Sequence, residues 1–140
     1  MLFKIKGRVF SGMGKGKYYV GHPEYQRRFA DALGYKPYPG TLNVKLNGKK
    51  EEELMVRLRS MKGIGIGGFT ADGEPMSALI CYQGRLKGEK VTILAIDVTH
   101  YNESVAELIS PAYLRGEFGI KDGDEVEFEV ESEDSSRPRQ

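Results

Sequence analysis

The 140-residue sequence has only one cysteine, Cys81, and only two histidines, His22 and His100. A single cysteine cannot form an internal disulfide, and these three residues cannot supply a cysteine-based structural zinc site. Because Cys81 lies in the apolar segment 78–82, we predict that it is a small, buried core residue. The fold must therefore be stabilised by a hydrophobic core without such covalent or metal crosslinks.

Long apolar runs are also missing from the sequence. No window approaches the roughly 18 consecutive apolar residues of a membrane span. Charges interrupt residues 1–8, where a signal peptide would need an apolar stretch. We therefore expect a cytoplasmic protein with no membrane partner. The length predicts one domain over residues 1–131, followed by a flexible polar tail over residues 132–140.

The net charge is only +1, but charge is unevenly distributed along the chain. Residues 1–50 contain eleven lysines and arginines against two acidic residues, whereas residues 122–134 contain eight acidic residues and no basic one. A basic N-terminal third favours an anionic ligand, such as a nucleotide or a nucleic acid. A solvated basic face is the commoner explanation of such an excess, so the charge distribution alone does not establish an anionic ligand.

Alternating apolar and polar residues, and short apolar runs between glycine-containing turns, predict that most of the regular structure is β-strand. The predicted strands are residues 2–10, 18–20, 41–46, 77–86, 90–97 and 124–130. A helix is predicted at 23–33, which ends at Gly34, and a shorter one at 103–109, capped by Asn102. Residues 51–61 have a helix-like composition but a mixed pattern, so they stay unassigned.

Short strands with glycine turns favour a small β-barrel over a doubly wound parallel sheet. We expect a mainly β fold of about six strands with one or two short peripheral helices.

Two glycine-rich segments could contact phosphate. Gly63–Gly68 matches the letters G-x-G-x-x-G but lacks the preceding strand, the following helix and the later acidic residue of a dinucleotide site. We interpret it as a loop or irregular strand in which small residues allow another segment to approach. Ser11–Lys17 instead follows a predicted strand directly and alternates three glycines with two lysines.

Glycines in Ser11–Lys17 permit positive φ angles that turn backbone N–H groups toward one anion, and the lysines add positive charge. The segment therefore fits a phosphate-binding loop, although such a pattern is more often a plain connection. Thr41 and Asn43 add a second feature, because residues two apart on a strand project to the same face. Their side-chain oxygens could contact one Mg²⁺ ion, or they could be the polar half of an amphipathic strand.

Four motifs in the same order and spacing resemble the archaeal CTP-dependent riboflavin kinase family. They are Ser11–Tyr19, Pro37–Asn43, Ser110–Arg115 and Lys121–Asp124. The resemblance spans roughly residues 3–130. It implies a cradle-loop β-barrel that uses Mg²⁺ and transfers the γ-phosphate of CTP to the 5′-hydroxyl of riboflavin, giving FMN and CDP.

The resemblance also implies which residues form the site. Those placed on the nucleotide are Gly12, Met13, Gly14, Lys15, Gly16, Lys17, Tyr113, Leu114, Arg115 and Gly116. Thr41 and Asn43 are placed on Mg²⁺, and Thr99 and Glu107 on the flavin. The family often has an acidic residue or a lysine where this chain has Gly116 and Tyr113.

Phosphoryl transfer depends mainly on positioning and charge neutralisation, so the chemistry fits even without a dedicated base. Glu107 is the candidate to accept the hydroxyl proton, because it matches a flavin-site position. Asp97 is the other carboxylate considered, but it matches no such position and is interpreted as the end of a strand. His100 is interpreted as structural.

The alternative function is a small barrel that binds nucleic acid or flavin through its basic N-terminal face without catalysis. Tyrosines interleaved with basic residues in segment 18–38 would suit such a protein. This alternative gives no reason for Thr41 and Asn43 to accompany the glycine-rich segment. We therefore expect a monomeric kinase that acts on riboflavin and CTP, with no nucleic-acid partner.

Overall fold

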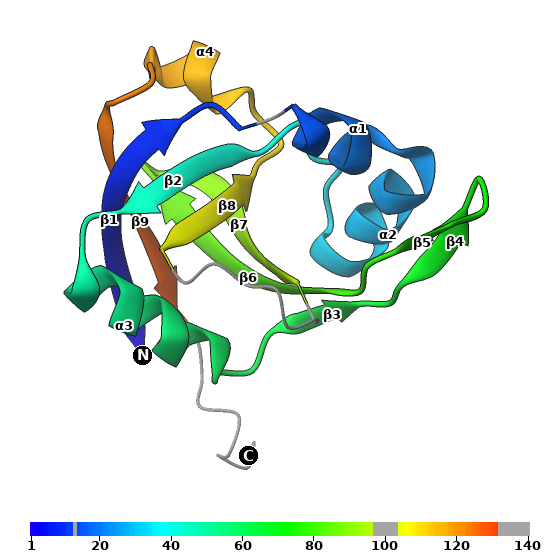
Figure 1. Cartoon of the computed structure of the whole chain (residues 1–140), viewed down its shortest axis with the longest axis horizontal. Coiled ribbons are helices and arrows are strands. Elements are labelled where there is room, and N and C mark those ends of the chain that lie inside the picture. Colours follow the sequence, from blue (N-terminus) through cyan, green and yellow to red (C-terminus); the bar gives the residue numbers. More distant parts are fainter. Residues whose placement is uncertain (13, 97–103, 132–140) are drawn as a thin grey trace.

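The structure is a computed structural model that describes residues 1–12, 14–96 and 104–131 (Figure 1). Its elements, in chain order, are β1 (Leu2–Phe10), α1 (Lys15–Gly21), α2 (Pro23–Leu33), β2 (Leu42–Leu46), α3 (Lys49–Arg59), β3 (Ile64–Ile66), β4 (Phe69–Ala71), β5 (Glu74–Met76), β6 (Leu79–Leu86), β7 (Glu89–Ile96), β8 (Val105–Ile109), α4 (Leu114–Phe118) and β9 (Glu125–Glu131). None of the described helices is long and apolar enough to cross a membrane.

Six antiparallel strands close into a barrel in the order β6-β7-β8-β2-β1-β9. The ring closes because β9 pairs with residues 84–86 of β6, while β3 pairs with residues 79–81 along the same edge. β4 and β5 form a separate two-stranded hairpin. The predicted mainly β barrel of about six strands is confirmed, and the described residues contain four helices where one or two were predicted.

Barrel closure depends on glycine at two positions where neighbouring strands lie very close together. A Cβ atom at Gly7 would lie 2.4 Å from the Lys45 carbonyl oxygen, and one at Gly84 would lie 2.1 Å from the Glu129 carbonyl oxygen. Real Cβ atoms cannot approach backbone so closely, so only glycine fits at these two positions.

Apolar side chains pack on both sides of the barrel wall. Inward-facing residues, including Ile5, Val44 and Phe128, form the main core. A second apolar cluster lies outside the wall, where α1 and α2 cover β6, β7 and β8 (Figure 1). Cys81 belongs to this outer cluster and is 1% exposed, which confirms its predicted burial, and desolvation raises the pKa of its thiol to about 12.

Most of the predicted elements are confirmed. The strands at 2–10, 41–46, 77–86, 90–97 and 124–130 correspond to β1, β2, β6, β7 and β9, and the helix at 23–33 is α2. The unassigned segment 51–61 lies largely in α3. In Gly63–Gly68, β3 forms and a Cβ at Gly63 would lie 2.5 Å from the Ile80 side chain, so the close approach expected there is confirmed.

Two local predictions are wrong. Residues 18–20 belong to α1 instead of a strand, because burial of Val20 in the outer cluster outweighs the weak helix propensity of this segment. Residues 105–109 form β8 instead of a helix, because they pair with β2 on one side and β7 on the other. The predicted cap, Asn102, lies outside the described residues.

The pairing of β1 with β9 sets the basic and acidic segments of the chain side by side. Lys4 Nζ lies 3.8 Å from Glu129 Oε1, and Lys6 Nζ lies 3.8 Å from Glu127 Oε2. Exposed pairs of this kind add at most about 1 kcal/mol each to stability. They do place acidic groups on the basic face, which weakens the nucleic-acid alternative.

Candidate functional site

A row of outward-facing residues crosses four strands of the barrel wall. Cys81, Leu94, Glu107 and Asn43 are successive register partners on β6, β7, β8 and β2. The row is apolar on β6 and β7 and polar on β8 and β2. The strand register therefore places a carboxylate and a carboxamide beside an apolar surface.

The glycine-rich segment lies directly on the Thr41–Asn43 pair. A Cβ at Gly12 would lie 2.5 Å from Asn43 Nδ2, and one at Gly16 would lie 2.6 Å from Thr41 Oγ1. Gly14, at the N-cap of α1, has a φ of 82°, which favours glycine. The predicted loop is shorter than expected, because α1 begins at Lys15 and takes the second half of the segment into a helix.

The Thr41 hydroxyl donates a hydrogen bond to Asn43 Oδ1 over 3.2 Å, and both side chains are half-buried. Two neutral oxygens this close could contact one cation at the short distances that Mg²⁺ requires. In the part of the chain that the structure describes, no cluster of three or more histidine, cysteine, aspartate or glutamate side chains could hold a metal. The donor chemistry of Thr41 and Asn43 thus fits a Mg²⁺ ion that keeps other ligands.

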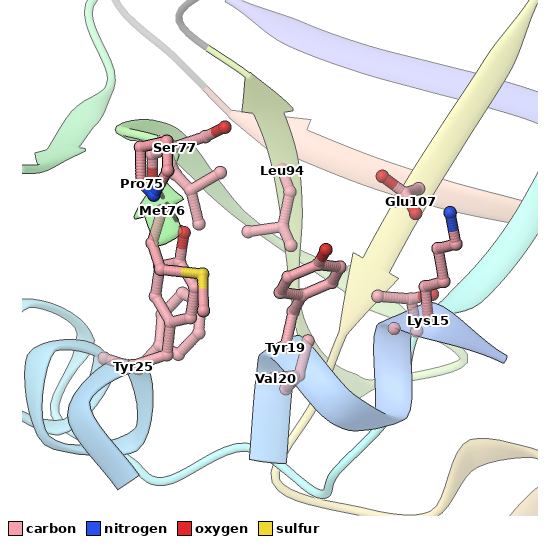
Figure 2. A pocket seen from close by; sticks show the side chains of 13 residues that line it. Lys15, Tyr19, Val20, Tyr25, Pro75, Met76, Ser77, Leu94 and Glu107 are labelled. Carbon is pink, nitrogen blue, oxygen red and sulfur yellow. Dashed lines mark hydrogen bonds between the residues drawn. The ribbon is translucent and has the colours of Figure 1, made fainter. Parts of the chain in front are cut away.

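Glu107 lies at the centre of the site. It is half-buried beside Asn43, and burial raises the pKa of its carboxyl group above the ordinary value of 4.5. Figure 2 shows the Lys15 side chain extending from α1 toward the same space as the carboxylate. A carboxylate in this environment is a stronger proton acceptor than an exposed one.

Three adjoining cavities run along this outer wall. The first has a volume of about 330 Å³ and is mostly apolar (Figure 2). It is lined by Lys15, Gly16, Tyr19, Val20, Tyr25, Phe29, Thr41, Pro75, Met76, Ser77, Leu79, Leu94 and Glu107. The second, of about 450 Å³, is lined by Phe10, Ser11, Gly12, Gly14, Lys15, Gly16, Lys17, Gly40, Thr41, Asn43, Val105, Glu107 and Arg115.

The third cavity, of about 290 Å³, is lined by Lys17, Tyr38, Pro39, Gly40, Thr41, Leu42, Leu108, Ser110, Ala112, Tyr113, Leu114 and Arg115. The first and second cavities share Glu107 and Lys15, and the second and third share Lys17 and Arg115. The cavities therefore form one groove with an apolar end, a polar centre and a tyrosine-lined end.

Two tyrosines stack at the third cavity. The ring centroids of Tyr38 and Tyr113 are 4.8 Å apart, and about half of each residue is exposed. A Cβ at Gly116 would lie 2.6 Å from the Tyr113 ring. The absence of a side chain at Gly116 therefore makes room for the Tyr113 ring.

Asp122 ties the glycine-rich segment to α4. Its carboxylate accepts a hydrogen bond of 2.7 Å from the Ser11 hydroxyl and another of 2.7 Å from Arg115 Nη2. Both hydrogen bonds lower the pKa of Asp122, and the bond from Ser11 has the larger effect. The Lys121–Asp124 motif thereby fixes the start of the segment that covers Thr41 and Asn43.

The structure brings most of the predicted site residues together. Those that line the central cavity are Gly12, Gly14, Lys15, Gly16, Lys17, Thr41, Asn43, Glu107 and Arg115, and those at the third cavity are Tyr113 and Leu114. Gly116 lies against the Tyr113 ring. Met13, Thr99, Asp97 and His100 lie outside the described residues.

Sequence reasoning missed the apolar wall and Tyr38. Tyr25 and Phe29 had the spacing of ordinary core residues, and they do pack in the outer cluster as well as lining the first cavity. The sequence pattern places Tyr19, at the end of the Ser11–Tyr19 motif, in a strand, whereas it lies in α1. The two tyrosines at the end of the Ser11–Tyr19 motif were an available signal, because aromatic side chains commonly line small-molecule sites.

Comparison with known proteins identifies related sequences over most of the chain. The matching family model, CTP-dep_RFKase, described as "Domain of unknown function DUF120", covers residues 9–130. A protein of Archaeoglobus fulgidus named "Riboflavin kinase" is 42% identical over 127 residues, which are 91% of this chain and 54% of that protein.

Two further archaeal proteins carry the same name. That of Methanocella arvoryzae is 38% identical over 130 residues, covering 91% of this chain and 56% of the relative. That of Ignicoccus hospitalis is 37% identical over 126 residues, covering 90% of this chain and 70% of the relative. The chain spans about half the length of the first two relatives. From the extent of these matches, together with the shared motifs, the chain belongs to the CTP-dep_RFKase family.

Proposed function

We propose that this protein is a CTP-dependent riboflavin kinase, which forms FMN and CDP. The observation that carries the proposal is the groove, whose apolar, polar and tyrosine-lined parts follow one another in the order that a flavin, a triphosphate and a nucleobase require. The names of the relatives support riboflavin as the acceptor. The family name supports CTP as the donor.

Riboflavin would occupy the first cavity. Its ring system is flat and largely apolar, and Tyr19, Phe29 and Leu94 offer apolar surface in a cavity of suitable size for a small molecule. The ribityl chain would extend toward Glu107, which lines both the first and the second cavity. The 5′-hydroxyl would then meet the phosphates at this boundary.

The phosphates of CTP would occupy the second cavity. Lys15 and Lys17 would neutralise phosphate charge, and the glycines allow the backbone to approach the phosphates. Thr41 and Asn43 would hold Mg²⁺, which when bound supplies further charge neutralisation to the transferring group. Glu107 would accept the proton of the riboflavin 5′-hydroxyl as its oxygen bonds to the γ-phosphorus, while the bond from the γ-phosphorus to the β–γ bridging oxygen breaks and CDP leaves.

The cytosine base would occupy the third cavity, beside the Tyr38–Tyr113 stack. Aromatic stacking gives affinity for any base, because every base has a π-face. Selection of cytosine then requires hydrogen bonds to the edge of the base.

We expect FMN to form from riboflavin and Mg²⁺ with CTP at least about tenfold faster than with ATP, GTP or UTP, a ratio that one or two edge contacts can supply. The measurement supplies each nucleotide separately and quantifies FMN by chromatography. Equal rates with CTP and ATP would contradict the donor assignment. If none of the four nucleotides supported FMN formation, the kinase assignment would be contradicted.

Replacing Gly14 by Val should weaken the binding of CTP and CDP about tenfold or more. No atom lies within 4 Å of a Cβ built at Gly14, so the cost comes from the φ of 82°, which a β-branched residue strongly disfavours. Calorimetric titration with CDP measures the effect. Riboflavin affinity, measured by flavin fluorescence quenching, should stay within twofold, and unchanged CDP affinity in a folded variant would identify the segment as a plain connection.

A further inference from the structure

One wall of the first cavity is a hairpin that is not part of the barrel. Within the described residues, β4 and β5 pair only with each other, around a turn in which Asp72 and Gly73 have positive φ angles. Met76 of β5 and the flanking Ser77 line the cavity (Figure 2). An isolated two-stranded hairpin is marginally stable in water, so its position depends on the element that it packs against.

That element is α2, which holds the start of the hairpin through Arg28. The Nη1 atom of Arg28 donates a hydrogen bond to the Gly67 carbonyl oxygen over 3.1 Å, and the guanidinium carbon lies 4.7 Å from the centroid of the Phe69 ring. Arg28 Nε also donates to Glu24 Oε2 over 2.6 Å, which fixes the guanidinium plane. The contact combines a charge-assisted hydrogen bond with a cation–π interaction.

The other end of the hairpin is held by Tyr25, which lies on α2 one helical turn before Arg28. Tyr25 Oη donates a hydrogen bond of 2.7 Å to the Ser77 carbonyl oxygen, and the Tyr25 ring lies edge-on to Phe69 at 4.8 Å. Tyr25 itself lines the first cavity, whereas Arg28 does not. Arg28 therefore contacts the hairpin but not the cavity itself.

We propose that Arg28 is a positioning residue for riboflavin, which holds the β4–β5 hairpin in place as the wall of the flavin cavity. The inference rests on the proposed function, because it takes the first cavity as the riboflavin site. Arg28 sets the shape of the apolar end of the groove and has no part in the phosphate-binding centre. Its loss should affect riboflavin binding and leave the handling of CTP unchanged.

The chain offers a matched control on the same helix. Arg27 also pairs with Glu24, and it contacts Asp31 of α2 instead of the hairpin. Arg27 and Arg28 together lower the pKa of Glu24 to about 2. Substitution of either arginine by methionine removes the same charge and one partner of Glu24, but only Arg28→Met removes the contacts to Gly67 and Phe69.

We expect Arg28→Met to raise the riboflavin Kd and KM about tenfold, equivalent to about 1.4 kcal/mol. Its kcat and its KM for CTP should stay within twofold of the unchanged protein. Arg27→Met should leave all four quantities within twofold. Phe69→Leu, which keeps an apolar residue in β4 but removes the ring face, should reproduce the riboflavin effect, and thermal unfolding shows that each variant is folded.

A second measurement reports on the hairpin without any ligand. A protease that cleaves before aspartate should cut between Ala71 and Asp72 several-fold faster in Arg28→Met than in Arg27→Met, because a released hairpin is more accessible. Equal cleavage rates in the two variants would show that Arg28 does not hold the hairpin in place, and would overturn the proposal. Faster cleavage with unchanged riboflavin affinity would overturn the positioning role. If the unchanged protein fails to bind riboflavin while the cleavage difference persists, the proposed function fails and the hairpin contact stands as structural alone.

Discussion

Thr41→Val and Asn43→Leu are each expected to lower FMN turnover about 10²- to 10³-fold while the barrel stays folded. Each substitution removes one of two oxygens that lie 3.2 Å apart at the centre of the groove. Both replace a half-buried polar side chain, at Asn43 in β2 or at Thr41 just before it, by an apolar one of similar size, which costs a purely structural position about 1 kcal/mol or less. The loss of activity should therefore far exceed the loss of stability.

The measurement is FMN production as a function of Mg²⁺ concentration. Partial recovery at high Mg²⁺ is the expected sign of weakened metal binding. Lys45→Met provides the control, because Lys45 lies on the same face of β2 two residues beyond Asn43 but is exposed and bonds to Ser104. Near-normal turnover of the Thr41→Val and Asn43→Leu variants at limiting Mg²⁺ would show that these two residues do not bind the metal.

Glu107→Gln is expected to lower kcat by about 10²- to 10⁴-fold, the usual contribution of a positioned base. Glutamine keeps the shape of the side chain but cannot take the proton of the riboflavin hydroxyl. Because burial raises the pKa of Glu107, its ionised form is lost at a higher pH than that of an exposed carboxylate. The kcat of the unchanged protein should fall as the pH drops through this raised pKa, and the kcat of the Glu107→Gln variant should show no such fall.

The same substitution should raise the thermal stability at neutral pH. A folded-state pKa above the unfolded value means that the folded protein binds the proton more tightly, so Glu107 costs stability as the pH rises through its folded pKa. Glutamine removes that cost, and the difference in Tm should vanish below the unfolded pKa. An unchanged kcat, or a Tm lowered at neutral pH, would contradict the assignment of Glu107 as a desolvated base.

The sequence predicts most directly the strands in which apolar and polar residues alternate. In β2 every second residue is apolar, and in β1 Phe3, Ile5 and Val9 follow the same period, so the strand period is visible without knowledge of the partners. The segment Val105–Ile109 contains good helix formers, and it becomes a strand only because β2 and β7 flank it. Likewise, α1 gains its stability from Val20, which packs on residues distant in the sequence.

The polar centre of the site was predictable, because the glycine-rich segment and the Thr41–Asn43 pair are each local patterns. The apolar end was not, since it depends on the register that aligns Leu94 with Glu107 and on a hairpin held by Arg28. Both relationships join residues far apart in the sequence. Short-range patterns therefore indicated the chemistry of the site but not the shape of the cavity beside it.

The closure of the barrel has a consequence for protein synthesis. Among the described elements, β1 is made first and its partner β9 last, and β9 also supplies the final pairing with β6. Until β9 leaves the ribosome, one edge of β1 and residues 84–86 of β6 stay unpaired, and they can pair wrongly with other chains. Asp122, which anchors the glycine-rich segment at Ser11, is also made late. The nascent chain can therefore form the proposed nucleotide site only after nearly all of its described strands have been translated.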